Sequence, residues 1–162
     1  MNGSSSALII QEHCPNCGAL VTEGRSGCQA LFDKLSIRAL TNPAFSPSRL
    51  LAFDTYCMQH VETYCLSAKS YAAHLTRLCC GLEFGGSSTV YAALQKWLNG
   101  TVEITKPQVL RLRGSITIVD ASKSNNSHEN QLRVNEWANS VWQAYACQQN
   151  LAQTWIAVAL KT

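Results

Sequence analysis

Two cysteines separated by a Pro-Asn pair, Cys14 and Cys17, constrain the fold of this chain more than any other feature of its sequence. Pro15 and Asn16 favour a tight turn, and Gly18 can take the positive φ that such a turn requires. Two thiols on one tight turn are typical of a zinc knuckle, in which both thiolates bind the same ion and backbone N–H groups support the sulfurs. We therefore expect the beginning of the chain to fold around a metal ion.

The Cys-x-x-Cys motif has two other interpretations, a redox-active pair and a pair without function. A redox pair normally lies at the start of a helix within a thioredoxin-like βαβ unit, and no strand-rich stretch surrounds this motif. The opening residues lack the basic and apolar regions of a secretion signal. We therefore expect a cytoplasmic protein, in which the eight cysteines are thiols rather than disulfides.

A structural zinc ion takes four ligands, so two more must come from elsewhere in the chain. We expect Cys28 to be the third, because it lies near the start of a predicted helix, where the helix dipole favours a thiolate. His60 is the expected fourth, because it ends the second predicted helix. Cys57, Cys65 and His74 are alternatives to His60, and iron is an alternative to zinc, because soft thiolates bind both metals. The predicted Zn²⁺ ligands are therefore Cys14, Cys17, Cys28 and His60.

A different use of the same region would make the protein an enzyme or a sensor. Cys57 lies three residues before His60 and on nearly the same helical face, so the imidazole could activate this thiol. Asp54 and Gln59 could orient an imidazole that binds metal. The phosphate-binding, hydrolase and zincin motifs GxxxxGK[ST], GxGxxG, GxSxG and HExxH are all missing. We therefore predict a structural-zinc adaptor module, with a metal- or thiol-dependent enzyme or sensor as the alternative.

Apolar residues recur every three or four positions through most of the chain, which predicts a mainly α, compact bundle of about five helices. The first helix is expected to start at Ser26, which has capping-box spacing to Gln29. The next three are expected to start near Ser46, Ser67 and Ser88. The last is expected to run as one long helix over 127–160, and its tryptophans are expected to form core rather than to stack on a ligand. Three further cysteines are also expected in the core: Cys79, Cys80 and Cys147.

The periodicity changes to two between residues 108 and 120. Alternating runs at 109–113 and 116–119 flank Gly114 and Ser115, which predicts a β-hairpin with a two-residue turn just before the last helix.

With 46% apolar and only 14% charged residues, the 162-residue chain is typical of one globular domain, which we place at 13–162. Its zinc knuckle and first helix start occupy 13–30, and residues 1–12 are expected to form a flexible arm. No uncharged apolar run reaches the roughly 18 residues that a membrane span needs.

A net charge of +3 is too small for a dedicated nucleic-acid interface. Basic residues are in excess only between 96 and 123, where Lys106, Arg111 and Arg113 are the candidates for nucleic-acid contact, and a solvated face is the usual explanation of such a group. We therefore expect neither nucleic acid nor a membrane as the partner. A protein partner is expected, and four tryptophans together with a long amphipathic final helix favour self-association.

Several stretches spread over residues 14–156 form a combination that is more specific than any one of them. They are CPNCGA at 14–19, Cys28 at a helix start, Asp54-x-Tyr56-x-x-Gln59-His60, Ser70-x-x-x-His74-Leu75 and Trp137-Ala-x-x-Val141-Trp142-x-Ala-Tyr145. The combination resembles an uncharacterised bacterial family of small proteins with CPxCG, DxYxxQH and WAxxVWxAY motifs and no assigned activity. The resemblance implies a compact helical protein in which Cys14, Cys17, Cys28 and His60 share one site. The chain differs from that family at Val61, where the family has proline, and in its cysteines at 57, 65, 79 and 80.

Overall fold

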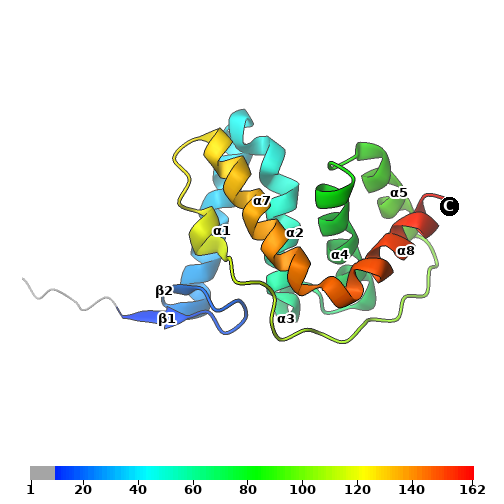
Figure 1. Cartoon of the computed structure of the whole chain (residues 1–162), viewed down its shortest axis with the longest axis horizontal. Helices are drawn as coiled ribbons and strands as arrows, with labels where there is room; N and C mark the ends of the chain where they lie inside the picture. Colours follow the sequence, from blue (N-terminus) through cyan, green and yellow to red (C-terminus); the bar gives the residue numbers. More distant parts are fainter. Residues whose placement is uncertain (1–9) are drawn as a thin grey trace, which may run out of the picture.

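A computed structural model describes residues 10–162, and in this structure the chain is mainly helical (Figure 1). A short antiparallel hairpin, β1 (Gln11–His13) and β2 (Leu20–Thr22), encloses the Cys-x-x-Cys turn. Glu12 pairs with Val21 at the centre of the hairpin. The predicted fold class, a mainly α fold with one short hairpin, is confirmed, but the hairpin lies at the other end of the chain from its predicted place.

The helices form two groups in Figure 1, one on the hairpin side and one beside the C-terminus. The first group contains α1 (Gly24–Thr41), the 3₁₀ segment η1 (Pro43–Ser48), α2 (Arg49–Gln59), α3 (Val61–Tyr64), α6 (Ile118–Ala121) and α7 (Ser127–Ala144). The second contains α4 (Ala68–Glu83), α5 (Ser88–Asn99) and α8 (Gln149–Ala159), and the 3₁₀ segment η2 (Ala146–Gln148) joins α7 to α8. Among residues 10–162, no helix has both the length and the hydropathy needed to cross a membrane.

Helix α2 lies at the centre of the bundle, in contact with α1, α4 and α7. Its last six residues, 54–59, are all buried, so this end of the helix is surrounded by protein on every side. The fully buried ring of Trp137 on α7 packs edge-on against Tyr56, with 6.4 Å between ring centroids. Because α2 ends at Gln59, the next residue, His60, is held at a well-packed position.

The predicted helix over 127–160 is wrong, because the chain bends at η2 into two helices (Figure 1). Side chains at the bend form hydrogen bonds with distant parts of the chain. The Tyr145 hydroxyl donates to the carbonyl of Met58 at 2.6 Å, and Gln148 accepts from the Tyr71 hydroxyl at 2.7 Å. The apolar spacing continues on both sides of the bend, so the periodicity does not reveal it. Cys147 lies in the bend and is exposed rather than part of the core.

The predicted hairpin at 108–120 is also wrong, because these residues contain no strand: 118–120 begin α6, and 108–117 belong to an irregular segment, 100–117, that we call the strap. Its backbone groups pair with helix side chains instead of with a second strand. The Gln59 amide donates to the carbonyls of Arg113 and Ile116, both at 2.9 Å. Gly114 crosses α7 so closely that a Cβ there would lie 2.9 Å from the Ser140 carbonyl. Glycine at position 114 therefore allows the strap to pass close to α7 and does not form a hairpin turn.

The starts of the first two helices also differ from the prediction. Helix α1 begins at Gly24, because Glu23 already turns the chain with a φ of 64°, so Ser26 is not the cap. Ser46 lies in η1, before the start of α2. The cap at Ser67 is confirmed, with a reciprocal capping box to Ser70.

Of the predicted arm at 1–12, residues 1–9 lie outside the described residues, whereas Gln11 and Glu12 belong to β1.

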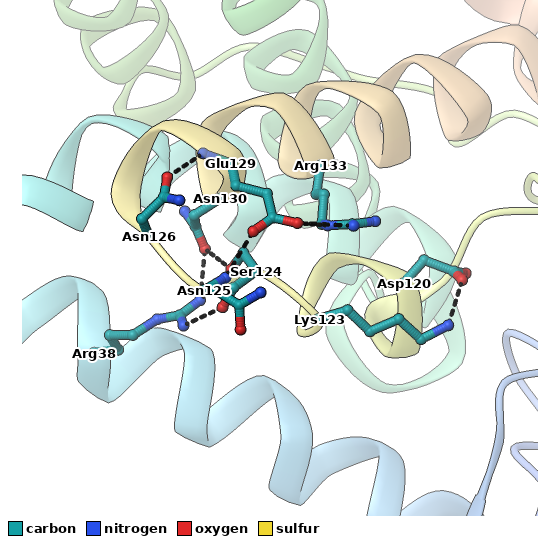
Figure 2. Close-up of polar contacts among 9 residues, drawn as sticks. All are labelled: Arg38, Asp120, Lys123, Ser124, Asn125, Asn126, Glu129, Asn130 and Arg133. Carbon is teal, nitrogen blue, oxygen red and sulfur yellow. Dashed lines mark hydrogen bonds and ion pairs between the residues drawn. The ribbon is translucent and has the colours of Figure 1, made fainter.

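Arg38, near the end of α1, holds the loop that precedes α7 (Figure 2). Its guanidinium donates to the Ser124 carbonyl at 3.2 Å, to the Ser124 hydroxyl at 2.8 Å and to Asn130 Oδ1 at 2.7 Å. The buried Asn130 amide in turn donates to the Ser48 hydroxyl at 2.7 Å. Arg38 therefore joins α1 to η1 and to the start of α7.

We expect Arg38→Ala to lower the free energy of unfolding by about 2 kcal/mol, because hydrogen bonds to a charged group contribute about 1.5–3 kcal/mol. Urea unfolding followed by circular dichroism measures the change. Arg133→Ala is the matched control, because Arg133 pairs with Glu129 one turn earlier on the surface of α7, and its loss should leave the urea midpoint unchanged (Figure 2). Equal losses in the two variants would contradict the anchoring role of Arg38.

Candidate metal centre

The structure brings Cys14, Cys17, Cys28 and His60 together, with their ligand atoms all within 4.8 Å of one another. Cys28 Sγ lies 3.6 Å from Cys17 Sγ and 3.4 Å from His60 Nε2. Cys14 Sγ lies 3.7 Å from the same His60 nitrogen. With Zn–S bonds of about 2.3 Å and a Zn–N bond of about 2.0 Å, a tetrahedral ion separates two sulfurs by about 3.8 Å and sulfur from nitrogen by about 3.5 Å. These three distances match a tetrahedral site, and the remaining pairs of donor atoms lie within 4.8 Å.

The turn between β1 and β2 positions the first two cysteines. Cys14 follows β1 directly; its N–H donates to the Ala19 carbonyl at 2.8 Å, and its carbonyl accepts from the Gly18 N–H at 2.9 Å. Gly18 has a φ of 78°, the positive value expected from the sequence. The side chain of Cys14 is buried, whereas Cys17 at the tip of the turn is partly exposed. The turn thus presents both sulfurs on its inner side.

A close approach between α1 and the hairpin positions Cys28. The residue before it, Gly27, lies against β2, and a Cβ at Gly27 would be only 1.7 Å from the Thr22 carbonyl oxygen. Any other residue would push the start of α1 away from the hairpin. Glycine at this position therefore allows Cys28, which is fully buried, to reach the sulfur of Cys17.

The end of α2 positions His60 and selects its tautomer. Its Nδ1 lies 2.7 Å from the carbonyl oxygen of Tyr56, so Nδ1 carries the hydrogen and donates it. Nε2 is left with a lone pair directed at the sulfurs, the arrangement seen in histidines that bind metal. The Tyr56 ring also stacks on the imidazole, with centroids 3.9 Å apart. Neither of the residues expected to orient this imidazole, Asp54 and Gln59, is its partner.

The role of Tyr56 was missed in the sequence, although the Asp54-x-Tyr56-x-x-Gln59-His60 pattern contains the signal. In a helix that ends at a histidine, the carbonyl oxygen of the residue four positions earlier lies close to the imidazole ring. For His60 that residue is Tyr56. The Tyr56 hydroxyl also lies 3.7 Å from Cys28 Sγ. Tyr56 therefore contacts two of the four candidate ligand residues, His60 and Cys28.

The electrostatics of the cluster favour a bound cation. A hydrogen bond with Cys28 and burial raise the pKa of the Cys17 thiol to about 12. The neighbouring Cys28 thiol therefore opposes the ionisation of Cys17, and a divalent cation removes this opposition because a coordinating thiol is deprotonated. Three sulfurs and one imidazole nitrogen are a donor set that suits zinc.

The structure does not bring the alternative ligands to this cluster. Cys57 and Cys65 are fully buried next to each other, and the Cys65 thiol donates to the Cys57 carbonyl at 3.8 Å. Burial raises the pKa of the Cys65 thiol to about 12 and that of Cys57 even further. His74 binds Asp54, with 2.9 Å between its Nδ1 and the Asp54 Oδ1. Cys79 and Cys80 are buried, as expected.

The chain belongs to a family described as a family of unknown function (DUF5946), which matches residues 12–146. The match covers all four residues of the cluster and confirms the expected membership of an uncharacterised family. No curated protein and no solved structure matches the chain. The family description assigns no activity, so the site itself has to carry the functional argument.

Proposed function

We propose that this member of a family of unknown function binds one zinc ion through Cys14, Cys17, Cys28 and His60, and that the ion has a structural role in a binding or adaptor protein. The observation that carries the proposal is the donor set, three sulfurs and one nitrogen that all lie within 4.8 Å of one another. These four donors fill every position of a structural zinc ion, whereas a catalytic zinc ion keeps one position open for water or substrate. Zinc held in this way stabilises the fold.

The location of the cluster supports a structural role. Its ligands come from the hairpin turn, from α1 and from the end of α2, so one ion would join three segments that are distant in sequence. Cys14, Cys28 and His60 are at most 3% exposed. None of the four residues lines the best-formed surface grooves among residues 10–162.

The alternative, an enzyme or sensor that uses Cys57 and His60, finds less support. Both ring nitrogens of His60 already have partners. Nδ1 bonds to the Tyr56 carbonyl, and Nε2 faces the sulfurs of Cys14 and Cys28. Burial raises the pKa of Cys57, so its thiol is protonated near neutral pH and is a poor nucleophile. We place the protein in a reducing compartment such as the cytosol, where thiols stay free to bind zinc and where a protein partner would be met.

Metal analysis of protein purified without an affinity metal column tests the proposal. We expect one zinc ion per chain, and we expect chelation to release three thiols together with the loss of cooperative folding. Cys57→Ala should keep the full zinc content and the same rate of thiol modification. Iron, a substoichiometric and exchangeable metal, or a fast-reacting thiol that Cys57→Ala removes would overturn the proposal in favour of the enzyme or sensor.

A further inference from the structure

A second group of ionisable side chains lies away from the metal centre, where α2 packs against α4. Asp54 of α2 is fully buried, and its Oδ1 lies 2.9 Å from Nδ1 of His74. Its Oδ2 lies 3.2 Å from Nε of Arg77, without the alignment of a hydrogen bond. Burial raises the pKa of Asp54, and the contacts with His74 and Arg77 oppose this rise. A buried carboxylate is costly for stability, and the metal centre does not use it.

Asp54 holds one edge of the Arg77 guanidinium and leaves the other edge free. The structure records no hydrogen bond from the terminal nitrogens of Arg77 to any of residues 10–162. The side chain is 27% exposed, so the guanidinium is reachable from solvent. An arginine paired with a carboxylate on its Nε side keeps its two terminal nitrogens available as donors, a geometry that matches the two oxygens of an oxyanion.

Arg77 lines a groove between α4 and α5 with a volume of about 640 Å³, which we call the α4–α5 groove. Ala73 and Lys69 lie one and two turns before Arg77 on the same face of α4, and Leu94 and Leu98 form the opposite, apolar wall. Among the described residues, the lining of this groove includes two basic side chains and no carboxylate. Small-molecule sites have this character, a volume of about 300–1,000 Å³ with apolar walls and a few placed polar groups.

We propose that the α4–α5 groove binds a small amphiphilic molecule that carries an oxyanion, either a carboxylate or a phosphate. The free edge of Arg77 binds the oxyanion, Asp54 keeps the guanidinium in place, and the apolar part of the molecule lies along Leu94 and Leu98. Lys69 supplies a second positive charge further along the groove. This site is separate from the metal centre, and the inference does not depend on the bound metal.

Three six-carbon probes test the proposal on the full-length protein: hexanoate, hexyl phosphate and the uncharged hexanol. We expect at least one of the two anions to bind saturably, at least tenfold tighter than hexanol, in titrations followed by NMR of the Arg77 Nε–H signal and by calorimetry. The stronger of the two anions identifies the headgroup. No saturable binding of either anion, or equal affinity for hexanol, would overturn the proposal.

Two variants separate binding in the groove from general effects on the fold. Arg77→Gln should weaken anion binding at least tenfold, but it also leaves Asp54 with His74 as its remaining partner. Ala73→Leu therefore gives an independent test, because it fills the groove without changing a charge and should also abolish binding. Arg133→Gln is the matched control on α7, with a side chain of similar exposure, 35% against 27% for Arg77, and should bind like the unmodified protein. Unchanged binding in a folded Ala73→Leu variant would place the ligand elsewhere and refute the assignment.

Discussion

Replacing Cys28 with serine is expected to remove the bound zinc and to lower the melting temperature by about 10 °C. Cys28 is fully buried, and its sulfur contacts both Cys17 and His60, so the remaining donors cannot complete a tetrahedral site. An ion that binds only the folded state at a free concentration of about 1,000 times its Kd stabilises that state by about 4 kcal/mol. A chain of this size loses about 2–4 °C of melting temperature per kcal/mol.

Zinc content by mass spectrometry and unfolding by scanning calorimetry measure this effect. Cys147→Ser is the matched control, because Cys147 is an exposed cysteine in η2 and its replacement should change neither quantity. Chelation of the unmodified protein should reproduce the Cys28→Ser result. A variant that loses zinc at an unchanged melting temperature would show that the ion is not structural, and one that keeps a full complement of zinc would remove Cys28 from the ligand set.

The second large effect is expected from Gln59→Ala, which should lower the free energy of unfolding by about 4 kcal/mol. The Gln59 side chain is fully buried, and its amide group holds the strap through the carbonyls of Arg113 and Ile116. Its oxygen accepts from Trp137 Nε1 at 2.8 Å. Alanine would leave these three groups unpaired, and each buried unpaired group costs about 1–3 kcal/mol.

Urea denaturation gives the size of the loss, and hydrogen exchange at the backbone amides of Ser115 and Ile116 shows whether the strap detaches. Gln143→Ala provides the control, because Gln143 is exposed on the same helix as Trp137 and its loss should cost less than about 0.5 kcal/mol. Zinc content should stay at one ion per chain in both variants, which separates the strap from the metal centre. If Gln59→Ala matched the control in stability and in exchange, the strap would be held by other contacts.

The strap is also linked to the hairpin that carries Cys14 and Cys17, through a series of polar side-chain contacts. Arg113 donates to Glu62 Oε2 at 2.8 Å, and Asn16 in the Cys-x-x-Cys turn donates to the same oxygen at 2.9 Å. The Arg113 guanidinium holds the pKa of Glu62 at about 2. Arg113 was one of three basic residues considered for nucleic-acid contact, and its burial in this ion pair makes it unavailable for phosphates.

The sequence by itself determined the features that depend on neighbours within one or two helical turns. The Cys14–Cys17 turn, the positive φ of Gly18 and the cap at Ser67 all follow from local chemistry, and each is present in the structure. The placement of His60 at a helix end is equally local. Together with the position of Cys28 near a helix start, these features named four candidate ligands, with Cys57, Cys65 and His74 left open as alternatives to His60.

Only the tertiary structure decided the features that depend on partners far along the chain. His60 rather than Cys57, Cys65 or His74 faces the other donors because α2 ends against the hairpin. The strap has no strand because helix side chains pair with its backbone, and at the bend between α7 and α8 the side chains of Tyr145 and Gln148 bond to distant residues. Alternating or helical spacing of apolar residues in the sequence predicts which side chains are buried. It does not predict with which distant group each backbone N–H or C=O forms its hydrogen bond.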